Sequence, residues 1–69
     1  MQHYYINLNL DKHGLNEVHR ASCYYLQIAT NKKYLGYFSN AINAVAYAKM
    51  IGFSKADGCY HCSIEAHHN

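Results

Sequence analysis

Three cysteines and one histidine form two short motifs that are typical of metal ligands. His19 is followed after three residues by Cys23, and Cys59 is followed after two residues by Cys62. Zinc binds four ligands in a tetrahedron and takes them from cysteine sulfur and histidine nitrogen. A gap of two or three residues lets one turn direct both members of a pair at the same ion. The spacing therefore predicts a structural zinc ion held by His19, Cys23, Cys59 and Cys62.

Two other histidines could replace His19 as the fourth ligand. The Cys-x2-Cys pair and His67 have the spacing of the first three ligands of a zinc knuckle, and Cys23 could complete that set. The position of His67, two residues before the last, favours His19 instead. His61 lies inside the Cys-x2-Cys loop, where we expect it to point away from the ion.

Two interpretations without a metal stay open. Free thiols are small side chains that bury well, so the cysteines could be core residues and His19 a surface strand residue. Alternatively, Cys59 and Cys62 could be the pair of a thiol-based redox protein. Such a pair normally starts a helix beside a βαβ unit, whereas this pair follows the only clear helix. Haem attachment is excluded because Ser63, rather than histidine, follows Cys62.

The first half of the chain has the pattern of a β-hairpin. Apolar residues alternate with polar ones over residues 4–10, which predicts a strand with one buried face; they are Tyr4, Ile6, Leu8 and Leu10. Residues 11–14 have turn chemistry, and Gly14 can take a positive φ. Residues 17–19 could then return antiparallel to the first strand, which would place His19 on the second strand.

The following segment is less regular. Residues 23–29 are ambiguous between strand and loop, and residues 31–33 indicate a turn. The aromatic-rich segment 34–38 predicts a strand, in which Gly36 indicates a bulge or a close approach.

A helix is predicted from residue 40 to about residue 51. Ser39 is the expected N-cap, because its hydroxyl can accept a free backbone N–H of the first turn. Gly52 is suited to end the helix. Residues at helical spacing suggest the buried face; they are Ile42, Val45, Ala46, Lys49 and Met50.

Together these elements predict an α+β fold: a small antiparallel sheet of about three strands with one helix, stapled by a zinc site. The chain has 69 residues, which suits a single zinc-binding domain over residues 1–69. A chain of this length buries only about 60% of its unfolded surface, so such domains often need a disulfide, a metal or a partner.

Composition narrows the function classes. The odd number of cysteines, 3, argues against a secreted disulfide scaffold. No signal peptide or membrane span is visible, so we expect a cytoplasmic protein with no membrane partner. The formal charge of +2 is not a strong footprint for nucleic acid. No set of nucleophile, base and orienting group is apparent, and we therefore expect no enzyme.

Tyrosine pairs are a further feature of the sequence. Tyr4-Tyr5 and Tyr24-Tyr25, with nearby lysines, could form a stacking surface for single-stranded nucleic acid. The simpler interpretation is that one tyrosine of each pair is in the core and the other is half exposed. A nucleic-acid or a protein partner remains a hypothesis.

The order of these motifs resembles the Ada-like N-terminal zinc-binding module of bacterial DNA-alkylation response proteins. The resemblance covers residues 17–62 and rests on Val18-His19, Cys23, the aromatic strand, Ser39 with Ala44, Gly52-Phe53 and the Cys-x2-Cys pair. It implies the same fold, a zinc ion and a bacterial origin. In that family the first ligand is a cysteine that accepts a methyl group. Here it is a histidine, and an imidazole is not a thiolate nucleophile, so methyl transfer is not implied.

Overall fold

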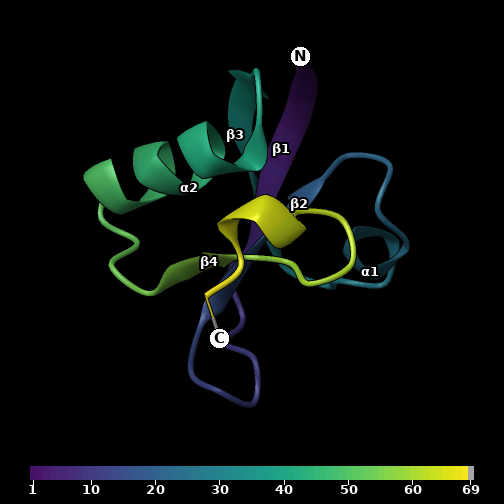
Figure 1. Cartoon of the computed structure of the whole chain (residues 1–69). Helices are drawn as coiled ribbons and strands as arrows, with labels where there is room; N and C mark the ends of the chain where they lie inside the picture. Colours follow the sequence, from purple (N-terminus) through teal and green to yellow (C-terminus); the bar gives the residue numbers. More distant parts are fainter. Residues whose placement is uncertain (69) are drawn as a thin grey trace.

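The computed structural model describes residues 1–68 and contains a four-stranded sheet with the strand order β3-β1-β2-β4 (Figure 1). The strands are β1 (Gln2–Asn7), β2 (Asn16–Arg20), β3 (Lys32–Phe38) and β4 (Ala56–Gly58). β1 pairs antiparallel with β2 and β3, and β4 pairs parallel with β2. The predicted α+β class is confirmed, and β4 is a strand beyond those predicted.

The main helix is α2 (Ala41–Met50), and two shorter helices complete the fold: α1 (Tyr24–Gln27) and the 3-10 helix η1 (Ile64–Ala66). The predicted N-cap of α2 was wrong by one residue. The side chain of Asn40 accepts the backbone N–H of Asn43 at 2.9 Å, whereas the Ser39 hydroxyl accepts a bond from the Asn43 side chain. Gly52, at φ 119°, follows the end of the helix as predicted.

The two faces of the sheet bury different residues. Successive side chains of a strand point to opposite faces, and Tyr4 and Tyr5 of β1 belong to two separate clusters. Tyr4 packs with Ile6, Leu35 and the buried side of α2. Tyr5 packs against the cluster formed by Leu26 of α1 and the three cysteines. Figure 1 accordingly shows α2 and α1 on opposite sides of β1 and β2.

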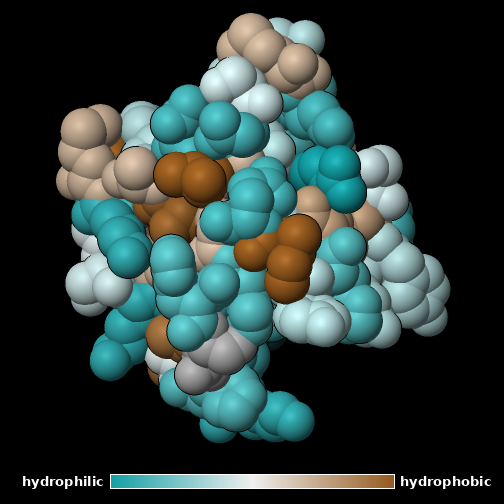
Figure 2. All heavy atoms as spheres, in the orientation of Figure 1, coloured by the Kyte–Doolittle hydropathy of each residue, from teal (hydrophilic) through white to brown (hydrophobic). Residues whose placement is uncertain are grey.

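The buried face of α2 differs from the predicted one. The helix buries Ala41, Ala44, Val45 and Ala48, whereas Ile42 is 53% exposed and Met50 is 75% exposed. Small side chains let the helix lie close to the sheet. This close packing outweighs the larger apolar area that Ile42 would bury. On the side drawn in Figure 2, apolar atoms gather over α2 and near η1, with hydrophilic atoms between them.

β1 ends earlier than the alternating pattern predicted. Leu8 and Leu10 lie outside the strand and are 37% and 58% exposed. The buried Asn16 donates its side-chain amide to the Asn7 and Leu8 carbonyls, which holds the chain as it leaves the sheet. The turn then closes on Asp11, whose carboxylate accepts two backbone N–H groups, and Gly14 has the expected positive φ of 77°.

β3 begins earlier than predicted, since Lys32 and Lys33 belong to the strand rather than to a turn. The register between β1 and β3 shifts opposite Gly36, which agrees with the predicted bulge. The ambiguous segment after Cys23 forms α1, a single turn of helix. Among the described residues, no helix is long and apolar enough to cross a membrane.

Candidate metal centre

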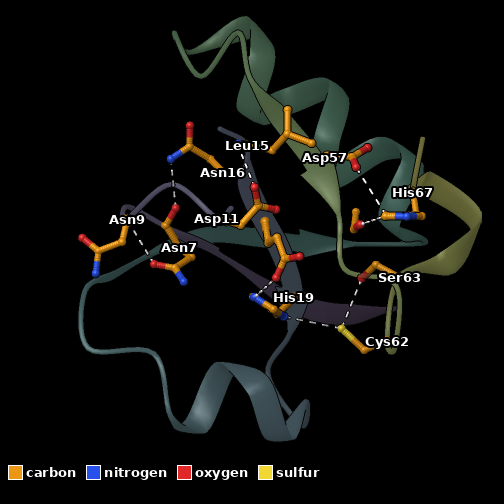
Figure 3. Close-up of polar contacts among 12 residues, drawn as sticks. Asn7, Asn9, Asp11, Leu15, Asn16, His19, Asp57, Cys62, Ser63 and His67 are labelled. Carbon is orange, nitrogen blue, oxygen red and sulfur yellow. Dashed lines mark hydrogen bonds and ion pairs between the residues drawn. The ribbon is translucent and has the colours of Figure 1, made fainter. Parts of the chain in front are cut away.

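His19 is placed in the interior by β2, a central strand of the sheet, and is only 1% exposed. Its Nδ1 atom lies 4.0 Å from the Cys62 sulfur, and its Nε2 atom lies 3.6 Å from the Glu17 carboxylate (Figure 3). Glu17 and His19 share a face of β2 because they are two residues apart. A carboxylate beside one imidazole nitrogen favours the proton there, which leaves the other nitrogen free to bind a metal.

Cys23 follows β2 after a turn that brings its thiol back toward His19. The turn is closed by the Cys23 N–H, which donates to the Arg20 carbonyl at 2.9 Å. The Cys23 carbonyl then accepts the N–H groups of Leu26 and Gln27 as α1 begins. The three-residue gap after His19 therefore lies at the end of a strand, as predicted, and leads into a helix that was not predicted.

Cys59 and Cys62 are brought together by a turn at the end of β4. The Cys59 N–H donates to the Val18 carbonyl at 3.0 Å, which continues the parallel pairing beyond the strand. The Ser63 N–H donates to the Cys59 carbonyl at 2.8 Å and closes the turn. The Arg20 N–H points at the Cys62 sulfur at 3.3 Å. Both cysteines of the Cys-x2-Cys pair are thus bonded to β2, Cys59 through its backbone N–H and Cys62 through its sulfur.

Gly58 is required before this turn because of close packing. It does not have a positive φ. A Cβ added at Gly58 would lie 2.8 Å from the Ala66 carbonyl carbon and would clash with the Ser63 carbonyl oxygen. Glycine is therefore needed at this position because η1 approaches closely, and not because of its backbone conformation.

The four predicted ligands converge. One atom from each of His19, Cys23, Cys59 and Cys62 lies within 4.8 Å of the other three. In a tetrahedral zinc site with Zn–S bonds of about 2.3 Å, neighbouring sulfurs are about 3.8 Å apart. The donor atoms need to contract by about 1 Å or less to reach that geometry. The donor set and its spacing therefore fit a metal ion.

The chain matches no protein family model, no curated protein and no solved structure. The candidate site is therefore supported by the chemistry and geometry of its own residues.

Burial and hydrogen bonding shift the pKa values of the three thiols in different directions. Burial raises the pKa of Cys59 to about 12 and raises that of Cys23 above its ordinary 9.0. Burial alone would also raise the pKa of Cys62, but it is outweighed by hydrogen bonds, the largest from His19 and Ser63, and the pKa falls to about 6. Cys62 is the thiol that is ionised most easily when a cation approaches.

The other histidines are directed elsewhere. His61 is exposed and stacks on Tyr25 at a ring distance of 4.4 Å, which agrees with the expectation that it points away. His67 does not join the cluster: its Nδ1 atom lies 2.9 Å from the Gly58 carbonyl and 3.4 Å from the buried Asp57 carboxylate. Asp57 also accepts the His68 backbone N–H at 3.0 Å.

Two residues of the centre were missed in the sequence analysis. Glu17 could have been found, because a carboxylate two residues from a ligand on a strand lies on the same face. Ser63, whose hydroxyl lies 3.4 Å from the Cys62 sulfur and which is fully buried, has no such pattern. Its role depends on a turn that only the folded chain defines.

Proposed function

We propose that this chain is a small binding module whose fold is closed by one structural zinc ion. The observation that carries the proposal is the convergence of one imidazole nitrogen and three sulfurs within 4.8 Å. Three thiols and an imidazole are soft donors that favour zinc over magnesium or calcium, which prefer oxygen.

Burial of the ligands favours a structural role for the ion. A catalytic zinc keeps an open coordination position for water or substrate, whereas four protein ligands close the site. His19 and Cys59 are each 1% exposed, and Cys23 and Cys62 are 6% and 9% exposed. We therefore propose no catalytic step for this centre.

The packing around the ligands gives the ion a role in stability. On this face of the sheet, the buried cluster consists of the three cysteines and Leu26, with Tyr5 packed against it. One leucine and one partly buried tyrosine supply little apolar area for holding α1 and the Cys-x2-Cys turn on the sheet. An ion bound by four residues would join β2, α1 and the turn after β4, and so replace part of a core.

A metal assay on the purified protein tests this proposal. We expect one zinc per chain by elemental analysis and a lower melting temperature after chelation, restored by adding zinc. Cys59→Ala should abolish tight zinc binding, whereas His61→Ala, which removes an exposed imidazole from the same loop, should leave it intact. Protein that is free of metal and melts identically with and without a chelator would refute the proposal.

A second candidate function is thiol-based redox chemistry at Cys59 and Cys62. The observation that favours it is the lowered pKa of Cys62, because the thiolate is the reactive form. Against it, both thiols are nearly inaccessible, and the pair follows a strand rather than starting a helix. One fast-reacting thiol in a metal-free, stable protein would favour this function over the zinc module.

Two further parts of the proposal follow from the chemistry of the chain. Three cysteines without disulfides suit a reducing compartment such as the bacterial cytoplasm. We also propose a relation to the Ada-like zinc modules. The support is that this chain and those modules have their motifs in the same order: a strand that ends in a ligand, a cysteine, a strand rich in aromatic residues, a capped helix and a Cys-x2-Cys pair.

A further inference from the structure

A row of exposed aromatic side chains lies on the sheet face opposite α2. We call His3 of β1 and Tyr34 and Tyr37 of β3 the aromatic row. His3 is paired with Tyr37 in the strand register, and Tyr5 is paired with Tyr34, so these side chains share one face. Tyr34 is 48% exposed and Tyr37 is 53% exposed. Exposed aromatic area of this kind on a small sheet is a feature of binding surfaces.

Contacts between the rings hold the aromatic row in place. The His3 ring lies 4.7 Å from the Tyr37 ring and 5.7 Å from the Tyr34 ring. The Tyr34 hydroxyl makes a 2.7 Å hydrogen bond with His3 Nδ1. Tyr34 also meets Tyr5 edge to face at 5.2 Å, and Tyr5 packs on the cysteine cluster. The row is therefore ordered before any partner binds, which reduces the entropy lost on binding.

The charge around the aromatic row suits a polyanion. Lys32 and Lys33 lie at the start of β3 and are exposed. Lys32 is paired with Asn7 and shares the face of the aromatic row, where its ammonium also donates to the Leu26 carbonyl at 3.1 Å, whereas Lys33 is paired with Ile6 and points to the α2 face. Neither β1 nor β3 contains a carboxylate. The acidic residues all lie elsewhere, in the turn after β1, in β2, in β4 and in η1; they are Asp11, Glu17, Asp57 and Glu65. A modest net charge of +2 is thus distributed so that the half of the sheet with the rings has only positive side-chain charge.

We infer that the aromatic row is a stacking surface for the bases of a single-stranded nucleic acid, with Lys32 contacting its phosphates. The inference rests on the proposed function and names the partner of that module. Aromatic side chains bind unpaired bases by stacking and tolerate different sequences. Bases inside a duplex are already stacked on one another and offer no free face, so double-stranded nucleic acid does not fit this surface.

A titration of the zinc-loaded protein followed by NMR tests the inference. Oligo(dT) and oligo(U) should each shift the backbone amide signals of β1 and β3 and leave those of α2 unchanged, and a duplex should bind more weakly. Tyr37→Ala should weaken binding by at least about fivefold, as expected for the loss of one stacking partner. Tyr37→Phe should keep the affinity because the ring remains. Tyr24→Ala, which removes a tyrosine of α1 that is 67% exposed, is the control and should bind like the unmodified protein.

The dependence of the affinity on salt concentration tests the phosphate contact of Lys32. Binding should weaken between about 50 and 200 mM salt, and Lys32→Ala should reduce the slope of log affinity against log salt by about 0.7, the value for one phosphate contact on a single strand. Lys33→Ala is the control, because this side chain points to the other face of the sheet, and it should leave the slope unchanged.

Several results would overturn the inference: no shifts with about 1 mM oligonucleotide, equal binding by Tyr37→Ala, or preference for the duplex. If the protein self-associates through Tyr37 and does not bind oligonucleotides, the surface binds a second copy of the chain instead. Zinc content is measured on the same samples. A folded, zinc-loaded protein that does not bind oligonucleotides would refute this inference and leave the proposed function intact.

Discussion

Replacing Gly58 by alanine should damage the metal centre without touching a ligand. An added Cβ would lie 2.8 Å and 2.9 Å from two carbons of Ala66 and would overlap the Ser63 carbonyl oxygen. Non-bonded carbons prefer about 3.5–4.0 Å, so η1 has to move by about 1 Å. Ser63 would move with it, and the Ser63 N–H holds the turn through the Cys59 carbonyl.

The size of the effect follows from the cost of overpacking. Adding a methyl group to a well-packed interior costs about 1–3 kcal/mol. If that cost falls on the zinc-bound state, the zinc affinity of Gly58→Ala should fall roughly 5- to 150-fold. Competition with a chromophoric chelator measures the affinity, and the absorption spectrum of the cobalt-substituted protein reports the ligand geometry.

Gly14→Ala is the matched control. Gly14 has a positive φ of 77° and open space around its Cα, so alanine there adds backbone strain far from the ligands. It should lower stability by about 1 kcal/mol and leave the cobalt spectrum unchanged. If Gly58→Ala binds zinc within about twofold of the unmodified protein, with the same cobalt spectrum, the assignment of the turn at Gly58 as a support of the site is wrong.

Three further predictions concern the environment of the ion and the helix. Glu17→Gln should lower zinc affinity by about tenfold or more in chelator competition, because the carboxylate orients His19; unchanged affinity would contradict this role. Zinc binding near pH 7 should release about two protons, measured by calorimetry in buffers of different ionisation enthalpy, because burial raises the pKa of two thiols while Cys62 is already ionised above pH 6. Affinity should therefore rise with pH, and its dependence should steepen below the Cys62 pKa of about 6, where a third proton must leave; a pH-independent affinity would refute the thiolate ligands. Asn40→Ala should reduce the free energy of unfolding by about 1 kcal/mol in denaturant titration, and Ser39→Ala should cost less.

The convergence of His19, Cys23, Cys59 and Cys62 could be predicted from the sequence, because the spacing within each pair is local information. Each pair is spaced by one turn, and the chemistry of zinc selects cysteine and histidine. The sequence favoured His19 over His67, but the contacts that keep His67 away from the cluster are visible only in the fold. His67 is held by the Gly58 carbonyl and the Asp57 carboxylate, and neither contact follows from the spacing of the cysteines.

Elements that depend on distant parts of the chain were harder to predict. β4 has only three residues and pairs parallel with β2, so no alternating pattern marks it. The buried face of α2 is made mainly of alanines, because the closeness of helix and sheet decided which residues fit. One tyrosine pair agrees with the prediction and one does not. Tyr4 is buried and Tyr5 is partly buried as predicted, whereas Tyr24 and Tyr25 are both exposed because the single turn of α1 buries Leu26 instead.

X-ray absorption at the zinc edge of the purified protein tests the central claim most directly. We expect three sulfur neighbours at about 2.3 Å and one nitrogen at about 2.0–2.1 Å, and the nitrogen should be lost in His19→Ala but kept in His67→Ala. A first shell dominated by oxygen, or one that keeps its nitrogen in His19→Ala and loses it in His67→Ala, would contradict the ligand set.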